Sequence, residues 1–363
     1  MPQQLLGLRS ASVTKASLLV AIGVSCGLNG CSEVERQTVD RTRDYDPTAF
    51  TSPEDCDAAV GDATPAAKRK PRIGSWNVRY FPDSQETAAD KPEDGTNVSW
   101  LSCAITSLGV DILAVQEFKL TARAREAQSE LIDQLNQRTG GDWQIELSSC
   151  DPEDVQHPGF VFDASRVKGS QFREIPDLNP FSVCSNDASP GFAGYFEIDG
   201  GPDFHFVSVH FPSGDAQSAL DARSQALAAM PKVTSDARAL VDDEDIIFAG
   251  DFNTSGCAEC DSPVESTSEI DDMRASFDEK DNPLHALGAD QACSREDDAN
   301  SHLLDHFALA DDMTEVPSDA TTHVGGFCAE GACERLQRWH VDARDHLSDH
   351  CPILLDLEST DDD

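Results

Sequence analysis

Several short apolar runs in this sequence end abruptly in polar residues, and this pattern constrains the fold more than any other feature. The run 246–249 is apolar throughout and is followed by Gly250, Asp251 and, two residues later, Asn253. Short runs of this kind are typical of strands that are covered on both faces. Asp251 and Asn253 are two residues apart, so an extended chain would place them on one face. The sequence therefore predicts buried sheets with polar side chains where the strands end.

The alternation of strands and helices predicts one α+β domain over residues 71–358, with two sheets packed face to face and helices outside. One helix is predicted where Val98, Leu101, Ile105 and Leu108 recur at helical spacing, with Asn97 as its N-cap. Two further helices are predicted at 122–138 and 216–240, and strands at 72–78, 112–115, 143–147, 159–162, 194–198, 205–209, 246–249, 306–310 and 351–357.

Residues 257–300 form a long acidic segment that contains cysteines and follows directly on the strand 246–249. An insertion at the end of such a strand would lie at the rim of any cleft there. We therefore expect this segment to control access to the cleft.

The N-terminus has the features of an export signal. Arg9 and Lys15 precede the apolar stretch 16–24, which is too short to span a bilayer. The following Leu28-Asn29-Gly30-Cys31 is similar to a bacterial lipoprotein cleavage box. We therefore expect residues 1–30 to be removed and Cys31 to carry a lipid on an exported protein; secretion without a lipid is the alternative.

The segments that flank the domain are polar. Residues 31–70 are rich in Asp, Thr and Pro and have no apolar period, so a disordered tether is predicted. Residues 359–363 are expected to form an acidic tail.

The sequence contains 12 cysteines, and ten remain when Cys26 is removed with the signal and Cys31 is assigned to the lipid. An even number in an exported protein indicates disulfides, whose pairing cannot be deduced from the sequence. Cys257 and Cys260 have the spacing of half a zinc site. No second half with matching spacing follows, so disulfides are favoured over zinc.

Acidic residues outnumber basic residues by 67 to 27, and the net charge is −40. Such a charge repels a polyanion at long range unless metal ions or a local basic patch offset it. Adaptation of the surface to salty water is the simpler explanation, and a bias against anionic partners is the other. Tight binding to long duplex DNA is not expected.

Polar residues close most of the predicted strands, and the same sequence stretches resemble a known superfamily. The motifs SWNV, VQEF, VSVHFPSGD, FAGDFNT, LLDHFAL and LSDHCPI are together similar to the endonuclease/exonuclease/phosphatase superfamily. That superfamily includes DNase I-like nucleases, sphingomyelinases and inositol-polyphosphate phosphatases. The resemblance covers about residues 72–358. It implies a four-layered α/β sandwich with two mostly antiparallel sheets, and hydrolysis of phosphate esters.

The resemblance also implies a divalent metal site. Glu117 would be the principal ligand, Asn77 its neighbour and Asp349 a further ligand. Mg²⁺ is the expected ion, because it takes oxygen ligands and needs only one or two carboxylates. Mn²⁺ and Ca²⁺ are the alternatives.

The catalytic roles follow from the same resemblance. His350 would lie next to the scissile phosphate, and Asp305 would fix its tautomer by a hydrogen bond. Asp251 would orient or deprotonate the attacking water, and Asn253 would donate to a phosphate oxygen. His210 would contact the phosphate from the other side.

DNA-cutting members of the superfamily carry an Arg and a Tyr in mid-domain that hold the phosphate backbone, and this sequence shows neither at a matching position. His157 and Tyr195 are the candidate substitutes for substrate binding. Arg79 follows Asn77 closely and is a third candidate.

These features predict a monomeric, metal-dependent phosphoesterase, most simply a nuclease-like phosphodiesterase, that contacts a membrane only through its lipid. A phosphatase or a sphingomyelinase-like enzyme is the alternative within the superfamily. A non-catalytic surface binding protein is the alternative outside it.

Overall fold

The computed structural model describes residues 47–60, 70–85, 95–181, 184–185, 189, 191–279, 282–296, 301–331, 333 and 340–359. The predicted signal, Cys31 and residues 360–363 lie outside these ranges. Within them, no helix combines the length and the apolar character that crossing a membrane would require.

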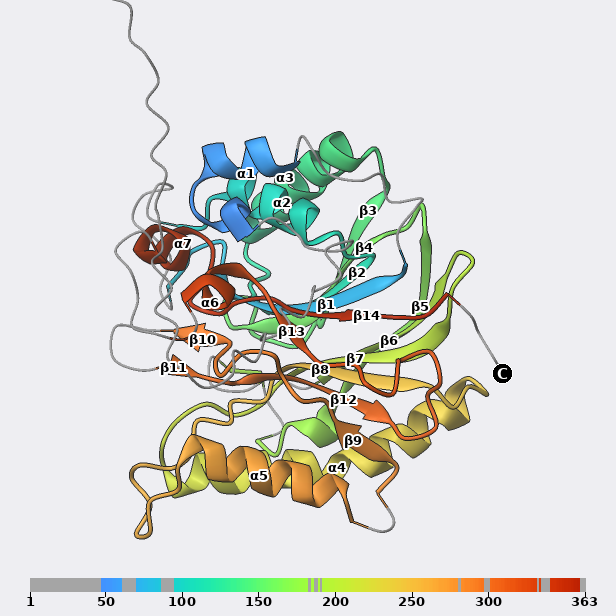
Figure 1. Ribbon diagram of the computed structural model, residues 1–363, viewed down its shortest axis with the longest axis vertical. Coiled ribbons are helices and arrows are strands. Elements are labelled where there is room, and N and C mark those ends of the chain that lie inside the picture. Colours follow the sequence, from blue (N-terminus) through green and yellow to red (C-terminus); the bar gives the residue numbers. More distant parts are fainter. Residues whose placement is uncertain are drawn as a thin grey trace, which may run out of the picture. The chain divides into compact units, whose positions relative to one another are not determined.

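Two six-stranded sheets face each other, with helices α1 to α3 outside the first sheet and α4 and α5 outside the second (Figure 1). The strands run in the order β13-β14-β1-β2-β4-β3 in the first sheet and β5-β6-β7-β8-β12-β9 in the second. Neighbours are antiparallel except for the parallel pairs β1–β2 and β7–β8. The predicted four-layered α/β sandwich with mostly antiparallel sheets is confirmed.

The bounds of the elements are as follows. The first sheet contains β1 (Arg72–Phe81), β2 (Ile112–Phe118), β3 (Trp143–Leu147), β4 (His157–Asp163), β13 (His323–Val324) and β14 (Ile353–Asp356). The second contains β5 (Val167–Ile175), β6 (Gly191–Ile198), β7 (Asp203–His210), β8 (Ile246–Asp251), β9 (Leu284–Ala286) and β12 (Asp305–Ala310). A small ribbon pairs β10 (Arg295–Glu296) with β11 (Ser301–His302). The helices are η1 (Pro47–Phe50), α1 (Pro53–Val60), α2 (Val98–Leu108), α3 (Ala122–Thr139), η4 (Pro176–Leu178), α4 (Gln217–Leu240), α5 (Ser266–Phe277), α6 (Gly326–Gly331) and α7 (His340–His346).

Aromatic side chains fill the space between the two sheets. Phe160 on β4 packs against Phe196 on β6, with ring centroids 4.9 Å apart, and against Phe206 on β7 at 5.2 Å. All three are fully buried. Burying a phenylalanine side chain contributes roughly 1.5–3 kcal/mol, so this cluster holds the sheets in register with each other. The strand ends of both sheets therefore meet at one edge of the sandwich.

Helix α2 begins and ends as its sequence predicts. The side chain of Asn97 accepts a hydrogen bond from the backbone N–H of Trp100, which satisfies one of the free donors of the first turn. Gly109 ends the helix in a left-handed conformation, which costs glycine little.

Part of the predicted tether is ordered, which corrects the expectation for residues 47–60. Phe50 is buried and packs against Trp76 at 5.8 Å, and Cys56 forms a disulfide with Cys103 on α2. The indole N–H of Trp100 donates to the carbonyl of Ala49. These few anchors lie too far apart in the sequence to form an apolar period, which is why the composition suggested disorder. Residues 61–69 lie outside the described part.

The ten cysteines form five disulfides, which confirms the prediction of disulfides over zinc for Cys257 and Cys260. The pairs are Cys56–Cys103, Cys150–Cys184, Cys257–Cys260, Cys293–Cys333 and Cys328–Cys351.

The acidic segment 257–300 is more than a rim. Its helix α5 buries Ile270, Met273 and Phe277, and β9 extends the edge of the second sheet. Only its last described residues, 293–296, reach the strand ends where the polar side chains gather. Strand β5 was not predicted, because this edge strand is polar and its residues are mostly half-buried or exposed.

We predict that the Cys56–Cys103 bond stabilises the protein more than the Cys257–Cys260 bond. The first spans 47 residues and the second three. The loss of chain entropy in the unfolded state predicts roughly 4 kcal/mol for the first and roughly 2 kcal/mol for the second. Urea unfolding of the two double-alanine variants would measure this difference. Equal losses in the two variants would show that residues 47–60 do not dock on the domain in solution.

Candidate active site

The predicted strand-end residues lie together where the two sheets meet. In the parallel pair β1–β2, Asn77 lies opposite Gln116, next to Glu117. In the second sheet Asp251 pairs with both His210 and Asp305. The amide Nδ2 of Asn77 donates to Glu117 Oε1 at 2.8 Å and to Asp251 Oδ2 at 3.1 Å, which joins the first sheet to the second.

Glu117 is held in a strained and buried position. Its φ of 66° lies in the left-handed region, which is uncommon for a residue with a side chain and recurs at functional sites. Its Oε2 accepts a hydrogen bond from the backbone N–H of Tyr80 at 2.9 Å. Burial raises the pKa of this carboxyl, and His210 offsets part of the rise.

Gly250 allows β8 to end against β7. A Cβ at Gly250 would lie 2.0 Å from the carbonyl oxygen of Val209, and its φ is +150°. The side chain of Phe252 then packs into the core against Phe211, at 4.9 Å between ring centroids. This leaves Asp251 at the junction of the sheets, where burial raises the pKa of its carboxyl against the opposing effect of His350.

Asn253 lies beside Asp251 but already uses part of its amide. Its backbone N–H donates to Asp251 Oδ1, and its Nδ2 donates to the carbonyl of Phe211, each at 2.8 Å. Asn253 therefore fixes both the loop after β7 and the Asp251 carboxylate. Donation to a phosphate oxygen would use the remaining hydrogen of this amide.

His350 and Asp305 form the predicted pair. The His350 Nδ1 lies 2.9 Å from Asp305 Oδ2, and its Nε2 lies 3.6 Å from Asp251 Oδ2. The Ser294 hydroxyl donates to Asp305 Oδ2 at 2.6 Å. Burial lowers the pKa of His350, but the Asp305 and Asp251 carboxylates outweigh it and raise the pKa to about 9. At neutral pH the imidazole is therefore protonated.

His210 approaches the same carboxylates from β7. Its Nε2 lies 3.8 Å from both Glu117 Oε1 and Asp251 Oδ2. Its Nδ1 is buried and has no hydrogen-bond partner among the residues that the structure describes.

The donor set suits a hard divalent cation. The buried carboxylates of Glu117 and Asp251 both accept hydrogen bonds from the side-chain amide of Asn77. A bound cation would offset the free-energy cost of burying both negative charges. Carboxylate oxygens are the ligands that Mg²⁺ prefers. Asn77 turns its Nδ2 toward Glu117, while its Oδ1 accepts from the backbone N–H of Arg79. In this orientation the Nδ2 of Asn77 positions Glu117, and its Oδ1 already accepts one hydrogen bond.

Asp349 is bound by arginine. Its Oδ2 accepts from Arg295 Nε at 3.0 Å, and its Oδ1 lies 3.8 Å from Arg79 Nε. Burial raises the pKa of this carboxyl, but His350, Arg295 and Arg79 outweigh it and lower the pKa. Arg79 therefore lies at the site as predicted. Arg295 was not predicted, because it lies in the acidic segment outside any motif.

The structure places Tyr195, a predicted substrate-binding residue, away from the gathered strand ends. Tyr195 pairs with His205, which lies at the opposite end of β7 from His210, about 17 Å away at the usual rise per residue. Its hydroxyl is hydrogen-bonded to Asp203 and Asp243.

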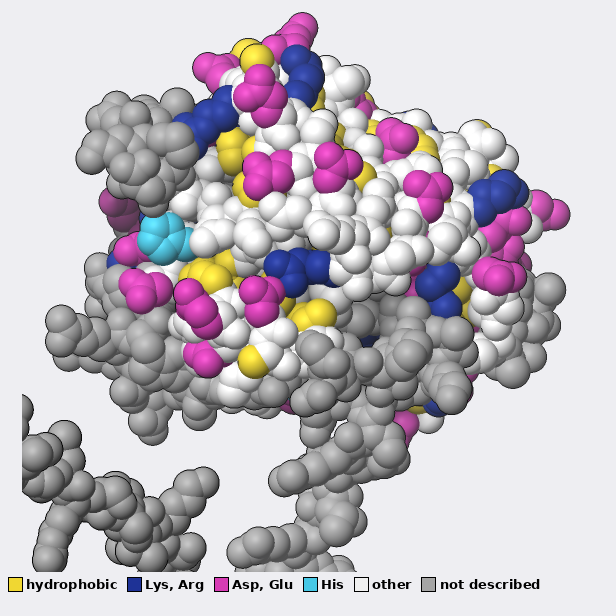
Figure 2. Space-filling view, turned by 90° about the horizontal axis from the view of Figure 1, so that it is seen from above, with side chains coloured by type: hydrophobic (Ala, Val, Ile, Leu, Met, Phe, Trp, Pro, Cys, Tyr) yellow, Lys and Arg dark blue, Asp and Glu magenta, His cyan; other side chains and the backbone are white. Residues whose placement is uncertain are grey.

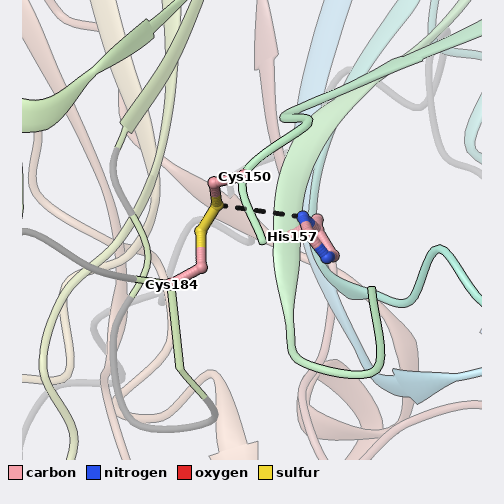
Figure 3. Close-up of side chains that lie close together, drawn as sticks. All are labelled: Cys150, His157 and Cys184. Carbon is pink, nitrogen blue, oxygen red and sulfur yellow. Dashed lines mark hydrogen bonds between the residues drawn. A yellow bond between two sulfur atoms is a disulfide. The ribbon is translucent and has the colours of Figure 1, made fainter. Parts of the chain in front are cut away.

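His157 is placed close to a disulfide. Its imidazole is fully buried, and its Nδ1 lies 4.0 Å from Cys150 Sγ of the Cys150–Cys184 bond (Figure 3). On β4 it pairs with Phe118, the residue after Glu117, but among the described residues no hydrogen bond or ion pair joins its ring to Asn77, Glu117 or Asp251. The structure shows no exposed surface of His157, so its contact with substrate stays a prediction.

A buried arginine holds the two loops behind the site. Arg223 on α4 donates to the carbonyls of Pro212, Gly214 and Gly256, and it pairs with Glu269 on α5 at 2.6 Å. These carbonyls belong to the loops that follow His210 and Asn253. Arg223 thus connects both loops to the outer helices.

Comparison with known proteins rests on the fold. No protein-family model matches this sequence, and no curated protein matches it. Among solved structures, a humanized TDP2 from D. rerio is 16% identical, with a TM-score of 0.51, and the match covers 80% of this chain and 99% of that one. An endonuclease/exonuclease/phosphatase from Bacteroides vulgatus is 16% identical, with a TM-score of 0.50 and the same two coverages. The chain has the endonuclease/exonuclease/phosphatase fold. In this fold the six strand ends that the sequence motifs marked converge on one site.

We predict that Asp305→Asn lowers the pKa of His350 from about 9 toward or below its ordinary value of 6.5. The amide carries no charge to oppose the effect of burial. Because the folded-state pKa is raised, this pair stabilises the fold fully below pH 6.5 and loses its effect as the pH rises through 9. The variant should therefore show a flatter dependence of unfolding free energy on pH in this window.

NMR titration of the histidine rings in EDTA would measure this pKa. Asp290→Asn is the matched control, because it removes a carboxylate from the exposed His323. An unchanged His350 titration in Asp305→Asn would contradict the assigned hydrogen bond.

We also predict that Arg223→Met destabilises the protein by about 3–5 kcal/mol, because it leaves the Glu269 carboxylate buried and unpaired. Glu269→Gln should cost less, since Arg223 keeps its three carbonyl partners. Chemical unfolding would give both values. A smaller loss in Arg223→Met than in Glu269→Gln would contradict this role for Arg223.

Proposed function

We propose that this protein is a divalent-metal-dependent phosphoesterase, most simply a nuclease-like phosphodiesterase. One observation carries the proposal. The Asp305–His350 pair, the Asp251 carboxylate and the Asn77–Glu117 pair lie together, buried, at the junction of the two sheets. This arrangement combines a carboxylate that can bind a metal ion (Glu117), an imidazole held in one orientation (His350) and a second carboxylate between them (Asp251). The fold supports the same conclusion.

His350, Asp251 and His210 would each have a separate role in the hydrolysis of a phosphate ester. With its pKa raised to about 9, His350 is protonated at neutral pH and suits donation from Nε2 to a phosphate oxygen rather than removal of a proton. Asp251 lies 3.6 Å from that Nε2 and would orient the attacking water. His210 would contact the phosphate from the side of Glu117.

Glu117 would hold the metal ion, with its carboxylate oriented by Asn77 and by the backbone N–H of Tyr80. A bound Mg²⁺ would supply positive charge against the charge that develops on the phosphate. Mn²⁺ and Ca²⁺ offer the same charge to the same oxygen ligands.

The surface favours small or single-stranded substrates over long duplex DNA. Figure 2 shows one face over which acidic side chains are spread, with fewer basic ones. A polyanion would be repelled by such a surface. Insertion into a lipid surface has little support, because the large hydrophobic side chains exposed in the described part are Phe181 and Leu240 alone. We therefore favour a soluble phosphodiester over a sphingomyelin-like substrate.

Export and lipid attachment at Cys31 complete the proposal. The five disulfides suit an oxidising compartment. Mass spectrometry of the mature N-terminus in a bacterial host would detect the lipid or its absence.

We predict that Glu117→Gln lowers hydrolysis of bis(p-nitrophenyl) phosphate by about a thousandfold, because charge stabilisation by a metal is worth several kcal/mol. Rates would be measured with Mg²⁺, Mn²⁺ or Ca²⁺, each with and without EDTA. The control is Glu130→Gln, an exposed residue of α3 whose loss should leave the rate unchanged. A wild type that is inactive with all three ions, or equally active in EDTA, would contradict the metal-dependent phosphodiesterase.

A further inference from the structure

Two guanidinium groups meet on one carboxylate beside His350. Arg295 donates to Asp349 Oδ2 at 3.0 Å, and the Nε of Arg79 lies 3.8 Å from Asp349 Oδ1. The side chains of both arginines keep about 30% of their surface exposed, at 30% for Arg79 and 29% for Arg295. Asp349 itself is buried. Both guanidinium groups therefore contact the buried Asp349 carboxylate while part of each side chain remains exposed to solvent.

The backbone under both arginines is fixed. Residue 295 forms a β-bridge with His350, and the N–H of Cys351 donates to the carbonyl of Ser294. The disulfides Cys293–Cys333 and Cys328–Cys351 hold the two segments on either side. Arg79 lies two residues after Asn77, and the backbone N–H of Arg79 donates to Asn77 Oδ1. The φ of Arg79, 31°, lies in the left-handed region. Such fixed backbones place the guanidinium groups in advance of any ligand.

Basic side chains are scarce in this chain, with 27 basic residues against 67 acidic ones, and two of them meet on Asp349. Arg79 Nη1 also donates to the backbone carbonyl of Arg344 and lies 4.0 Å from Asp345 Oδ1. The Asp349 carboxylate offers two oxygens and one negative charge to the two guanidinium groups. A phosphate offers more oxygens and more charge, and arginine binds it in a two-pronged manner.

We propose that Arg79 and Arg295 form a second anion subsite beside His350, which takes a phosphate group adjacent to the scissile ester. The inference rests on the proposed phosphoesterase function and narrows its substrate class. The preferred substrates are compounds in which the scissile phosphate ester is neighboured by a second, non-scissile phosphate. On binding, this second phosphate takes over the hydrogen bond that Arg295 donates to Asp349 and the ion pair that Arg79 makes with it.

The test compares two substrates with the same scissile bond. Thymidylyl-thymidine and its 5′-phosphorylated form differ only in the terminal phosphate. The wild type should cleave the phosphorylated form with at least a tenfold higher kcat/KM. Arg295→Gln and Arg79→Gln should each reduce this ratio about tenfold, mainly through KM. Arg125→Gln, which removes an exposed arginine paired with Glu153, is the matched control and should keep the wild-type ratio.

Two results would overturn the subsite. One is a wild-type ratio near one both for this pair and for a pair of inositol phosphates. The other is a ratio that stays unchanged in both variants, even if overall activity falls. A second pair, inositol 4,5-bisphosphate and inositol 5-phosphate, carries the second phosphate on the neighbouring ring carbon. The pair with the larger ratio shows whether the second phosphate comes from a polyol or from a nucleotide. The inference fails if neither pair shows a preference.

A binding measurement separates the subsite from the proposed activity. Calorimetry with inorganic pyrophosphate in EDTA needs no turnover and no metal. Pyrophosphate should bind the wild type at least tenfold more tightly than it binds Arg295→Gln. If it does so while no ester is hydrolysed, the subsite stands and the proposed function fails. Equal binding to both proteins overturns the subsite, whatever the activity.

Discussion

The amide of Asn77 is the contact on which the site depends, because it binds carboxylates from both sheets at once. Glu117 belongs to the first sheet and Asp251 to the second, and the two Nδ2 hydrogen bonds hold them at a common point. Two buried carboxylates so close together repel each other, and burial alone raises the pKa of both. The aromatic core between the sheets, and not the site itself, stabilises this unfavourable arrangement.

The polar groups around this contact form a continuous chain of hydrogen bonds. Ser294 donates to Asp305, Asp305 accepts from His350, and the Ser348 hydroxyl accepts from the N–H of His350 while it donates to the carbonyl of Asn77. Buried polar groups cost free energy unless they are paired, so each residue restricts the next. The disulfide at Cys351 and the buried Arg223 fix the loops that carry these groups. The geometry of the candidate site is thus fixed by contacts within the protein itself.

Elements and residues whose position depends on neighbours in the sequence were predicted correctly. Those whose position depends on contacts between distant parts of the chain were missed. Asn97 caps α2 as predicted, and the apolar runs that end at Glu117, His210 and Asp251 are the buried strands β2, β7 and β8. Strand β5 was missed because its order comes from pairing with β6 and not from an apolar pattern. Tyr195 was misplaced because it lies on a strand that passes the site, and the direction of that strand is a property of the sheet. Arg295 was missed because only the bridge to His350 brings it to Asp349.

The amino-acid sequence alone was enough to predict the strand ends, the types of side chain on them and the even number of cysteines. These follow from local burial and short spacing, which neighbouring residues in the chain encode. Three features became known only from the folded protein: which cysteines pair, that residues 47–60 dock on α2, and that Asn77 orients Glu117 with its amide nitrogen. The fold also places Asp349 against two arginines. Each of these depends on residues far apart in the chain, and their approach is set by the packing of the two sheets and not by any local preference.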